Sequence, residues 1–148
     1  MKKQFDQSLF EKHDAAARAA TSAFIRDRGW EVRENPDIYA QDLIATKGDA
    51  ELLIECEVKV VWDGGAFPFD TVQLPERKRK FFTPNTIFFV WNKDLSDAVY
   101  FSARDIQGLK PVLVSNKYIR SGEYFFQVPM NVTKLVSNAP VQDSVQEN

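Results

Sequence analysis

The stretch that decides the fold runs from residue 51 to residue 62 and reads ELLIECEVKVVW. Its even positions are apolar, whereas most of its odd positions are charged, with Leu53 and Val61 as exceptions. A period of two is typical of a β-strand with one buried face. We therefore predict a strand whose other face presents a row of charged side chains, namely Glu51, Glu55, Glu57 and Lys59.

The residues before this strand predict a helix and a hairpin. Residues 8–28 are rich in alanine and read as a helix that lies close against a sheet, with Gly29 as its C-terminal stop. Residues 30–34 and 42–46 read as short strands. Gly48 lies in the turn that follows and favours a positive φ, so we expect residues 42–46 to pair antiparallel with the charged strand.

The residues after it predict the rest of a mixed sheet. We expect a mobile loop over residues 63–69, followed by a second helix from about Asp70 to Phe82 that carries Gln73 and the basic run. Because Pro129 follows the last predicted strand, we expect that strand at a sheet edge. The fold class is therefore α/β or α+β, with helices flanking a mixed sheet. The further strands expected are residues 86–91, which are apolar and central, 98–102, 112–114 and 124–128.

Length and composition limit the class of protein. The chain has 148 residues, of which 44% are hydrophobic and 27% charged, as in a globular domain with a core of its own. We expect one domain over residues 1–137 and a disordered tail over 138–148. One cysteine, Cys56, excludes an internal disulfide, and one histidine, His13, excludes zinc sites that need two.

The charges and the N-terminus bear on location and partners. No apolar stretch is long enough to cross a bilayer, and no signal peptide is evident, so we expect a cytoplasmic protein without a membrane partner. The net charge of −2 excludes a general polyanion binder. Acidic residues crowd the stretch from residue 42 to residue 57, ahead of four consecutive cations at 77–80. The acidic cluster could bind a metal and the basic run a phosphate chain. The alternative is that both are ordinary solvated surfaces.

Asp42, Glu57 and Lys59 are the candidate catalytic residues. Glu57 and Lys59 are two apart in a strand, so they point to the same side, about 6–7 Å apart. A hairpin would bring Asp42 beside Glu57. Two carboxylates and the backbone carbonyl of Val58 are oxygen ligands that suit Mg²⁺, and Lys59 would then act on an attacking water. The alternative is an ordinary solvated sheet face with alternating Glu and Lys.

These motifs resemble the PD-(D/E)XK nuclease superfamily. The resemblance rests on Asp42-Leu43-Ile44-Ala45, a glycine turn and Leu53-Ile54-Glu55-Cys56-Glu57-Val58-Lys59 after a long helix, and it covers about residues 8–91. The most similar members are small ones, such as archaeal Holliday junction resolvases and phage nucleases. The resemblance implies a restriction-endonuclease-like core, Mg²⁺ on Asp42 and Glu57 (with Mn²⁺ as a substitute), and Lys59 assisting the hydrolytic water.

The resemblance also implies partners and a setting. It predicts a deoxyribonuclease, more in keeping with an endonuclease than an exonuclease, and a second helix that contacts the DNA backbone. The form of the DNA stays open. A homodimer fits relatives of this size, and a compact nuclease suits a phage, in which case the host cytoplasm is its location.

Three positions depart from the family pattern or add to it. A literal Pro36-Asp37 pair precedes Asp42, so Asp37 rivals it as metal ligand. We favour Asp42 because it directly precedes an apolar strand. Glu55 is an additional carboxylate that would join the metal shell, hold Lys59 or shift the register of the motif.

Residues 73–80 are candidates for contacts with the substrate. Arg77 and Lys80 lie at i and i+3, so they share a helix face and would contact phosphates. Gln73 would hydrogen-bond the substrate or the motif lysine. The alternative function keeps the fold without catalysis, as an inactive module that binds nucleic acid or protein.

Overall fold

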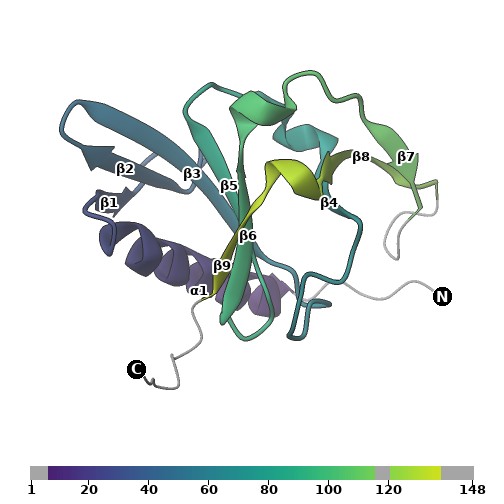
Figure 1. Ribbon diagram of the computed structural model, residues 1–148, viewed down its shortest axis with the longest axis horizontal. Helices are drawn as coiled ribbons and strands as arrows, with labels where there is room; N and C mark the ends of the chain where they lie inside the picture. The colour runs from purple at the N-terminus through teal and green to yellow at the C-terminus, as the bar shows by residue number, and fades with distance from the viewer. Residues whose placement is uncertain (1–6, 116–120, 138–148) are drawn as a thin grey trace.

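The computed structural model describes residues 7–115 and 121–137, with side chains from Lys12 onward (Figure 1). The predicted tail, residues 138–148, lies outside the described residues. None of the helices in this part of the chain is long and apolar enough to cross a membrane. The elements in chain order are α1 (Gln7–Arg26), β1 (Glu31–Glu34), β2 (Leu43–Lys47), β3 (Ala50–Val58), β4 (Thr71–Pro75), the 3₁₀ helix η1 (Glu76–Phe81), β5 (Thr86–Trp91), β6 (Asp97–Ser102), η2 (Ala103–Ile106), β7 (Val112–Val114), β8 (Glu123–Pro129), η3 (Met130–Val132) and β9 (Lys134–Ser137).

The strands of the described residues form two sheets. The larger has the order β1-β2-β3-β5-β6-β9, and the smaller has the order β4-β8-β7. Within the large sheet β3 and β5 are parallel, while the other pairs are antiparallel. The mixed α+β class predicted from the sequence is thus confirmed. The predicted hairpin is also confirmed, since β2 pairs antiparallel with β3 and Gly48 has a φ of 58°.

Helix α1 covers one face of the large sheet. Ala17 is fully buried against it, which a small side chain permits at close approach. Trp91 Nε1 donates to Thr21 Oγ1 at 2.8 Å, and this hydroxyl donates to Ala17 O at 2.7 Å. Helix α1 ends at Arg26, two residues before the predicted end, and Gly29, with a φ of 89°, lies in the turn that follows. The core on this side is Ala17, Ile25, Val32, Leu43, Ala45, Ile54, Cys56, Phe89, Trp91, Ala98 and Val136.

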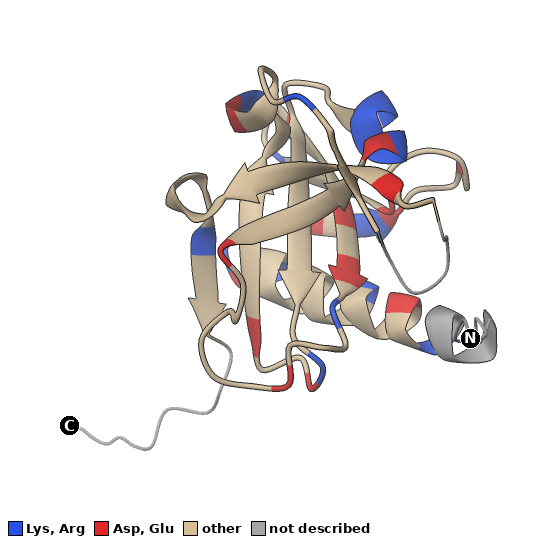
Figure 2. Cartoon of the chain, turned by 90° about the vertical axis from the view of Figure 1, so that its right-hand side faces the viewer, with Lys and Arg blue, Asp and Glu red and all other residues tan. Residues whose placement is uncertain are grey.

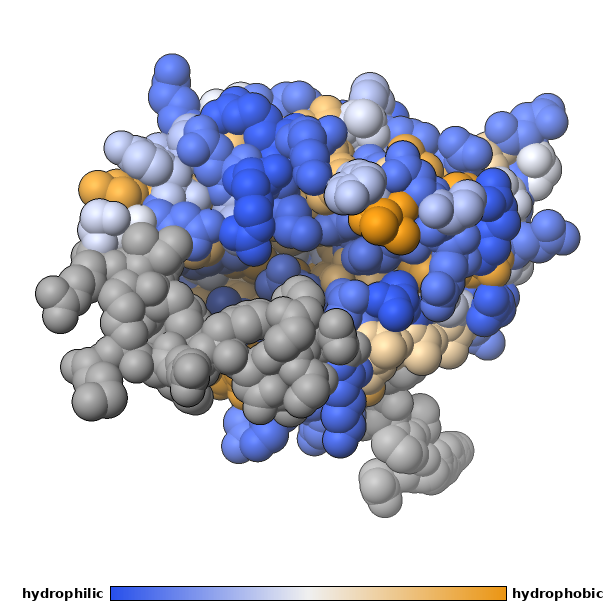
Figure 3. Space-filling view, turned by 180° about the vertical axis from the view of Figure 1, so that it is seen from behind, coloured by the Kyte–Doolittle hydropathy of each residue, from blue (hydrophilic) through white to orange (hydrophobic). Residues whose placement is uncertain are grey.

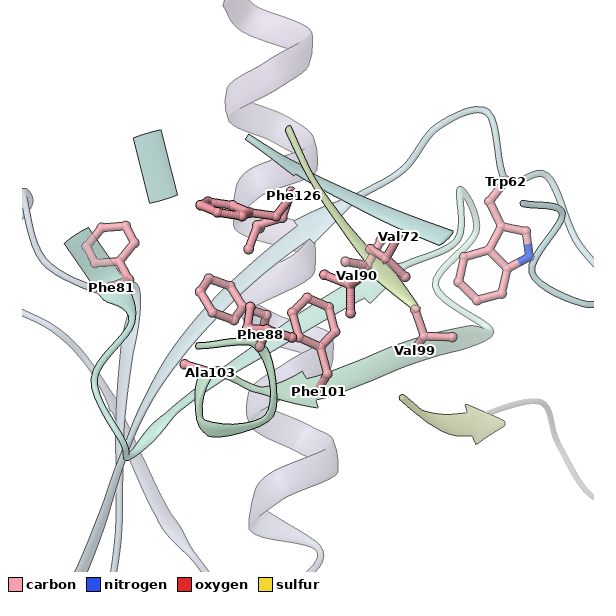
Figure 4. Close-up of a cluster of buried hydrophobic side chains, with 12 residues drawn as sticks. Trp62, Val72, Phe81, Phe88, Val90, Val99, Phe101, Ala103 and Phe126 are labelled. Atoms are coloured by element: carbon pink, nitrogen blue, oxygen red, sulfur yellow. The ribbon is translucent and has the colours of Figure 1, made fainter. Parts of the chain in front are cut away.

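The three-stranded sheet covers the opposite face of the large sheet. Alternate residues of β5 serve the two cores, because Phe89 faces α1 while Phe88 faces β8. Phe88 stacks on Phe101 with ring centroids 5.4 Å apart, and Phe126 lies above them (Figure 4). The core on this side is Trp62, Val72, Leu74, Phe81, Phe88, Val90, Val99, Phe101, Ala103, Ile106, Phe126 and Val128.

The second helix expected from Asp70 to Phe82 is wrong. Its first part is strand β4, which pairs with β8 and whose alternating Val72 and Leu74 are buried in the core between the two sheets. Pro75 then ends the strand, and the basic run forms the 3₁₀ helix η1. Burial of the alternating apolar pair stabilises the strand here more than helix propensity favours a helix.

Two further expectations need correction. The strand predicted over residues 51–62 ends at Val58, and a turn follows in which Trp62 N–H donates to Lys59 O at 2.9 Å. This turn sends Trp62 into the core under the small sheet. The strand expected at a sheet edge, β8, lies instead between β4 and β7. Pro129 is tolerated because it is the last residue of β8.

Figure 3 shows the face behind that of Figure 1. The described residues on this face are mainly hydrophilic, with hydrophobic side chains in small separate groups.

Candidate active site

Asp42 lies immediately before β2, where that strand meets β3. Leu43 is the register partner of Ile54, so the next step of the register places Asp42 opposite Glu55. The backbone N–H of Cys56 donates to Asp42 Oδ2 at 3.0 Å. The hairpin therefore holds the Asp42 carboxylate beside the charged face of β3.

A cavity of about 320 Å³ brings the acidic residues together. Its lining includes Asp42, Glu55 and Glu57 from the hairpin, and Lys78 from η1. We call it the carboxylate cavity. Figure 2 shows η1 as a largely basic segment of the chain. The two predicted metal ligands, Asp42 and Glu57, thus line one cavity.

Glu55 and Lys78 form an ion pair inside this cavity. Lys78 Nζ lies 2.7 Å from Glu55 Oε1, and the Glu55 side chain is only 7% exposed. Burial raises the pKa of Glu55 to about 7, because the nearby Lys78 only partly offsets the loss of hydration, and repulsion from Asp42 adds to it. A carboxyl group with this pKa can gain or lose a proton near neutral pH.

Burial also raises the pKa of Asp42 and of Glu57. For Asp42 the hydrogen bond from Cys56 opposes the shift, while repulsion from Asp14 adds to it. For Glu57 the opposing influences are the cations Lys78 and Lys59. The cavity therefore holds several carboxyl groups whose ionised forms are poorly hydrated, and a bound cation would stabilise those forms.

Lys59 does not line the carboxylate cavity. Together with Glu57 it lines a second cavity of about 730 Å³, which also has Phe69, Gln73 and Gln127 in its walls. We call this the amide cavity. Lys59 Nζ lies 5.3 Å from the centre of the Phe69 ring. The three predicted catalytic side chains therefore do not line a single cavity, because Glu57 borders both cavities whereas Asp42 and Lys59 line different ones.

The predicted substrate-binding residues divide between the same two cavities. Arg77 and Lys80 both line the carboxylate cavity, as their i, i+3 spacing predicts, because such positions eclipse each other in a 3₁₀ helix. Arg77 Nη1 also forms an exposed ion pair with Glu123 Oε2 at 2.7 Å. Gln73 projects from β4 into the amide cavity, which it shares with Lys59.

Asp37, the rival of Asp42, lies in an exposed turn. Its Oδ1 accepts a hydrogen bond from the Tyr39 N–H at 3.0 Å. Asp37 is not part of the wall that holds Glu55 and Glu57. The geometry therefore favours Asp42 as the partner of Glu57.

The donor set around Glu57 suits a Mg²⁺ ion. Asp42 and Glu57 supply hard carboxylate oxygens, and Mg²⁺ is usually held by one or two carboxylates together with substrate phosphates and waters. Val58 ends β3 and its side chain packs toward α1. Over residues 7–115 and 121–137, no three His, Cys, Asp or Glu form a group that could hold a metal ion.

Sequence reasoning missed two residues of the carboxylate cavity. Lys78 was one of four consecutive cations, and the sequence alone gives no reason to prefer it to its neighbours. Asp14 of α1 lines the cavity and is ion-paired with Arg18 one turn later. Its i, i+3 spacing to the buried Ala17 is the sequence signal that could have identified it.

No protein-family model, curated protein or solved structure matches this chain significantly. A functional hypothesis for the chain therefore rests on its own residues and their geometry.

Proposed function

We propose that this chain is a Mg²⁺-dependent deoxyribonuclease, acting as an endonuclease, with Asp42 and Glu57 as metal ligands and Lys59 as the residue that assists the water. One observation carries the proposal. The hairpin of β2 and β3 brings Asp42 and Glu57 to one cavity, and Lys59 lines the adjoining cavity, which Glu57 also borders. The shared cavity of the two carboxylates is what the resemblance to PD-(D/E)XK nucleases leads one to expect, whereas the place of Lys59 in the neighbouring cavity is not.

The roles follow from charge and position. Bound to Asp42, Glu57 and the Val58 carbonyl, Mg²⁺ (or Mn²⁺) would act as a Lewis acid toward the scissile phosphate. Lys59 donates hydrogen bonds to the attacking water and offsets the negative charge that develops on the phosphate. Arg77 and Lys80 hold the DNA backbone without reading its sequence.

The topology is compatible with a restriction-endonuclease-like core, although it departs from that core in one element. A long helix packs on an antiparallel hairpin whose second strand pairs in parallel with β5. The helix that the resemblance implies between those strands is replaced by β4 and η1. The basic run nevertheless borders the carboxylate cavity, so the proposed backbone contact needs no helix.

A cleavage assay tests the proposal. Purified protein is incubated with plasmid, linear duplex, single-stranded and branched DNA in Mg²⁺, in Mn²⁺ and in EDTA, beside Lys59→Ala and the exposed control Lys93→Ala. We expect cleavage that needs the metal and Lys59 but not Lys93. Absence of cleavage on every substrate by folded protein, checked by circular dichroism, would refute the enzyme.

A specific observation favours the alternative of an inactive binding module. The Lys78 ammonium is bonded to Glu55 among the acidic residues, where it competes with a cation for their charge. In a module of this kind, DNA would bind equally well with EDTA and with Mg²⁺, and Lys78→Ala would not create cleavage. Isothermal titration with Mg²⁺ separates the two functions, because only the enzyme needs a saturable metal site.

A further inference from the structure

The amide cavity has the size of a ligand site. It measures about 730 Å³, within the range of about 300–1,000 Å³ of small-molecule pockets. Glu57 and Arg77 line both this cavity and the carboxylate cavity. A group bound in the amide cavity therefore lies next to the proposed site of hydrolysis.

Two amide side chains stand next to each other in its wall. Gln73 of β4 and Gln127 of β8 are direct register partners, so their side chains project from the same face of the small sheet. Among the described residues, Gln73 Oε1 is buried and has no hydrogen-bond partner. A buried acceptor without a donor is costly and uncommon, and rotation of the Gln73 amide toward the cavity that its side chain lines would let an N–H group of a ligand satisfy it.

Aromatic rings and cations complete the lining. Phe69 is 42% exposed and lies at this cavity together with the half-buried Phe125. Lys59 and Arg77 supply positive charge on the side toward Glu57, in a lining that also holds the carboxylates of Glu57, Asp70 and Glu123, the last ion-paired with Arg77. Ring faces for stacking, amides for edge contacts and cations for phosphate are the three elements with which proteins bind unpaired nucleotides.

We propose that the amide cavity binds an unpaired base of a DNA strand whose phosphate lies at Glu57 and Arg77, so that the substrate is single-stranded or locally unpaired DNA. The proposal rests on the proposed nuclease function and names its substrate class. In a duplex the faces of a base are stacked and its pairing edge is occupied. Only a base outside the helix can therefore reach both the Phe69 ring and the Gln73 amide.

Binding without catalysis tests the proposal. The full chain is titrated in EDTA against a short fluorescein-labelled oligonucleotide, single-stranded or annealed to its complement, with fluorescence anisotropy as the readout. We expect tighter binding to the single strand. Phe69→Ala and Gln73→Leu should each weaken binding to the single strand about tenfold, as loss of a base-stacking contact does, and leave duplex binding unchanged.

Leu135→Ala is the matched control. It removes a 66% exposed apolar side chain from β9, at the edge of the other sheet, and should leave both affinities unchanged. Gln73→Leu keeps nearly the same volume and removes a buried polar atom that lacks a partner, so thermal unfolding should show a fold at least as stable as that of the wild type.

The outcomes separate this proposal from the nuclease function. The base site is overturned if both DNA forms bind with equal affinity. It is also overturned if Phe69→Ala and Gln73→Leu leave the affinity for the single strand unchanged. Either result holds even if Mg²⁺-dependent cleavage occurs. A single-strand preference that depends on these residues supports the base site, and it does so even if no cleavage is found and the nuclease function fails.

Discussion

The carboxylate cavity and the amide cavity share Glu57 and Arg77 as a common wall, yet the two differ in what they bury. In the first, burial raises the pKa of three carboxyl groups, and one ion pair offsets part of that cost. In the second, amides and rings face the space, and one amide oxygen has no partner among the described residues. The first arrangement is suited to chemistry that changes charge, and the second to recognition of a neutral, flat group.

The largest effect should come from removing a carboxylate of the carboxylate cavity. We expect Glu57→Gln or Asp42→Asn to lower cleavage more than about a thousandfold, because the several kcal/mol of a metal's charge stabilisation correspond to that factor. The double variant should be no worse than either alone, since the two act as one unit. Glu51→Gln, an exposed change on the same strand, should retain activity, which single-turnover kinetics would show.

The next largest effect should come from Glu55, which makes the wild-type stability depend on pH. Its pKa is about 7 in the folded state and lower when unfolded, so its contribution is fully present below the unfolded value, about 4.3 for a free glutamate. Stability should fall as the pH rises to about 7, by about 2–3 kcal/mol. Glu55→Gln should flatten the thermal-melting profile over this window. An unchanged slope would assign the pH dependence to other groups.

Breaking the ion pair should have a smaller effect on stability. Lys78→Ala leaves Glu55 buried without its cation, so we expect a loss of about 1.4 kcal/mol in unfolding free energy at pH 8, one unit above the Glu55 pKa, because protonation of Glu55 avoids any larger cost. At pH 5 the loss should be small, because Glu55 is then protonated. Urea denaturation at both pH values measures this, with the exposed Lys80→Ala as control. An equal loss at both pH values would contradict a charge-based role.

An effect of similar size should separate the two cavities. At ten times its dissociation constant, Mg²⁺ should stabilise the protein by about 1.4 kcal/mol through binding to the folded state alone. Differential scanning fluorimetry should show this shift in the wild type and in Phe69→Ala, but not in Asp42→Asn. Loss of the shift in Phe69→Ala would mean that the cavities are not functionally distinct.

The hairpin of the candidate site could be predicted from local patterns. Alternation across residues 51–58 set the strand, and Gly48 set the turn, so the position of Asp42 beside β3 followed from the register. These signals are strong because they involve neighbours in sequence and one clearly buried face.

The amide cavity could not be predicted, because its walls come from distant parts of the chain. Strand β4 pairs with β8 about fifty residues later, and such pairing is decided by packing instead of local propensity. The charged run after Pro75 favoured a helix, which concealed the alternation of Val72 and Leu74. The pairing of Lys78 with Glu55 was hidden for a similar reason, because four adjacent cations differ only in where the 3₁₀ turn points them.

The parallel pairing of β3 with β5 has a consequence for the order of folding. The hairpin of β2 and β3 closes across a short turn, whereas β3 can meet β5 only after the whole of residues 59–85 has been accommodated. Closing such a long segment costs chain entropy before contacts compensate for it. We therefore expect Asp42 and Glu57 to approach each other early, on the hairpin, while Lys78 and Gln73 arrive late and together.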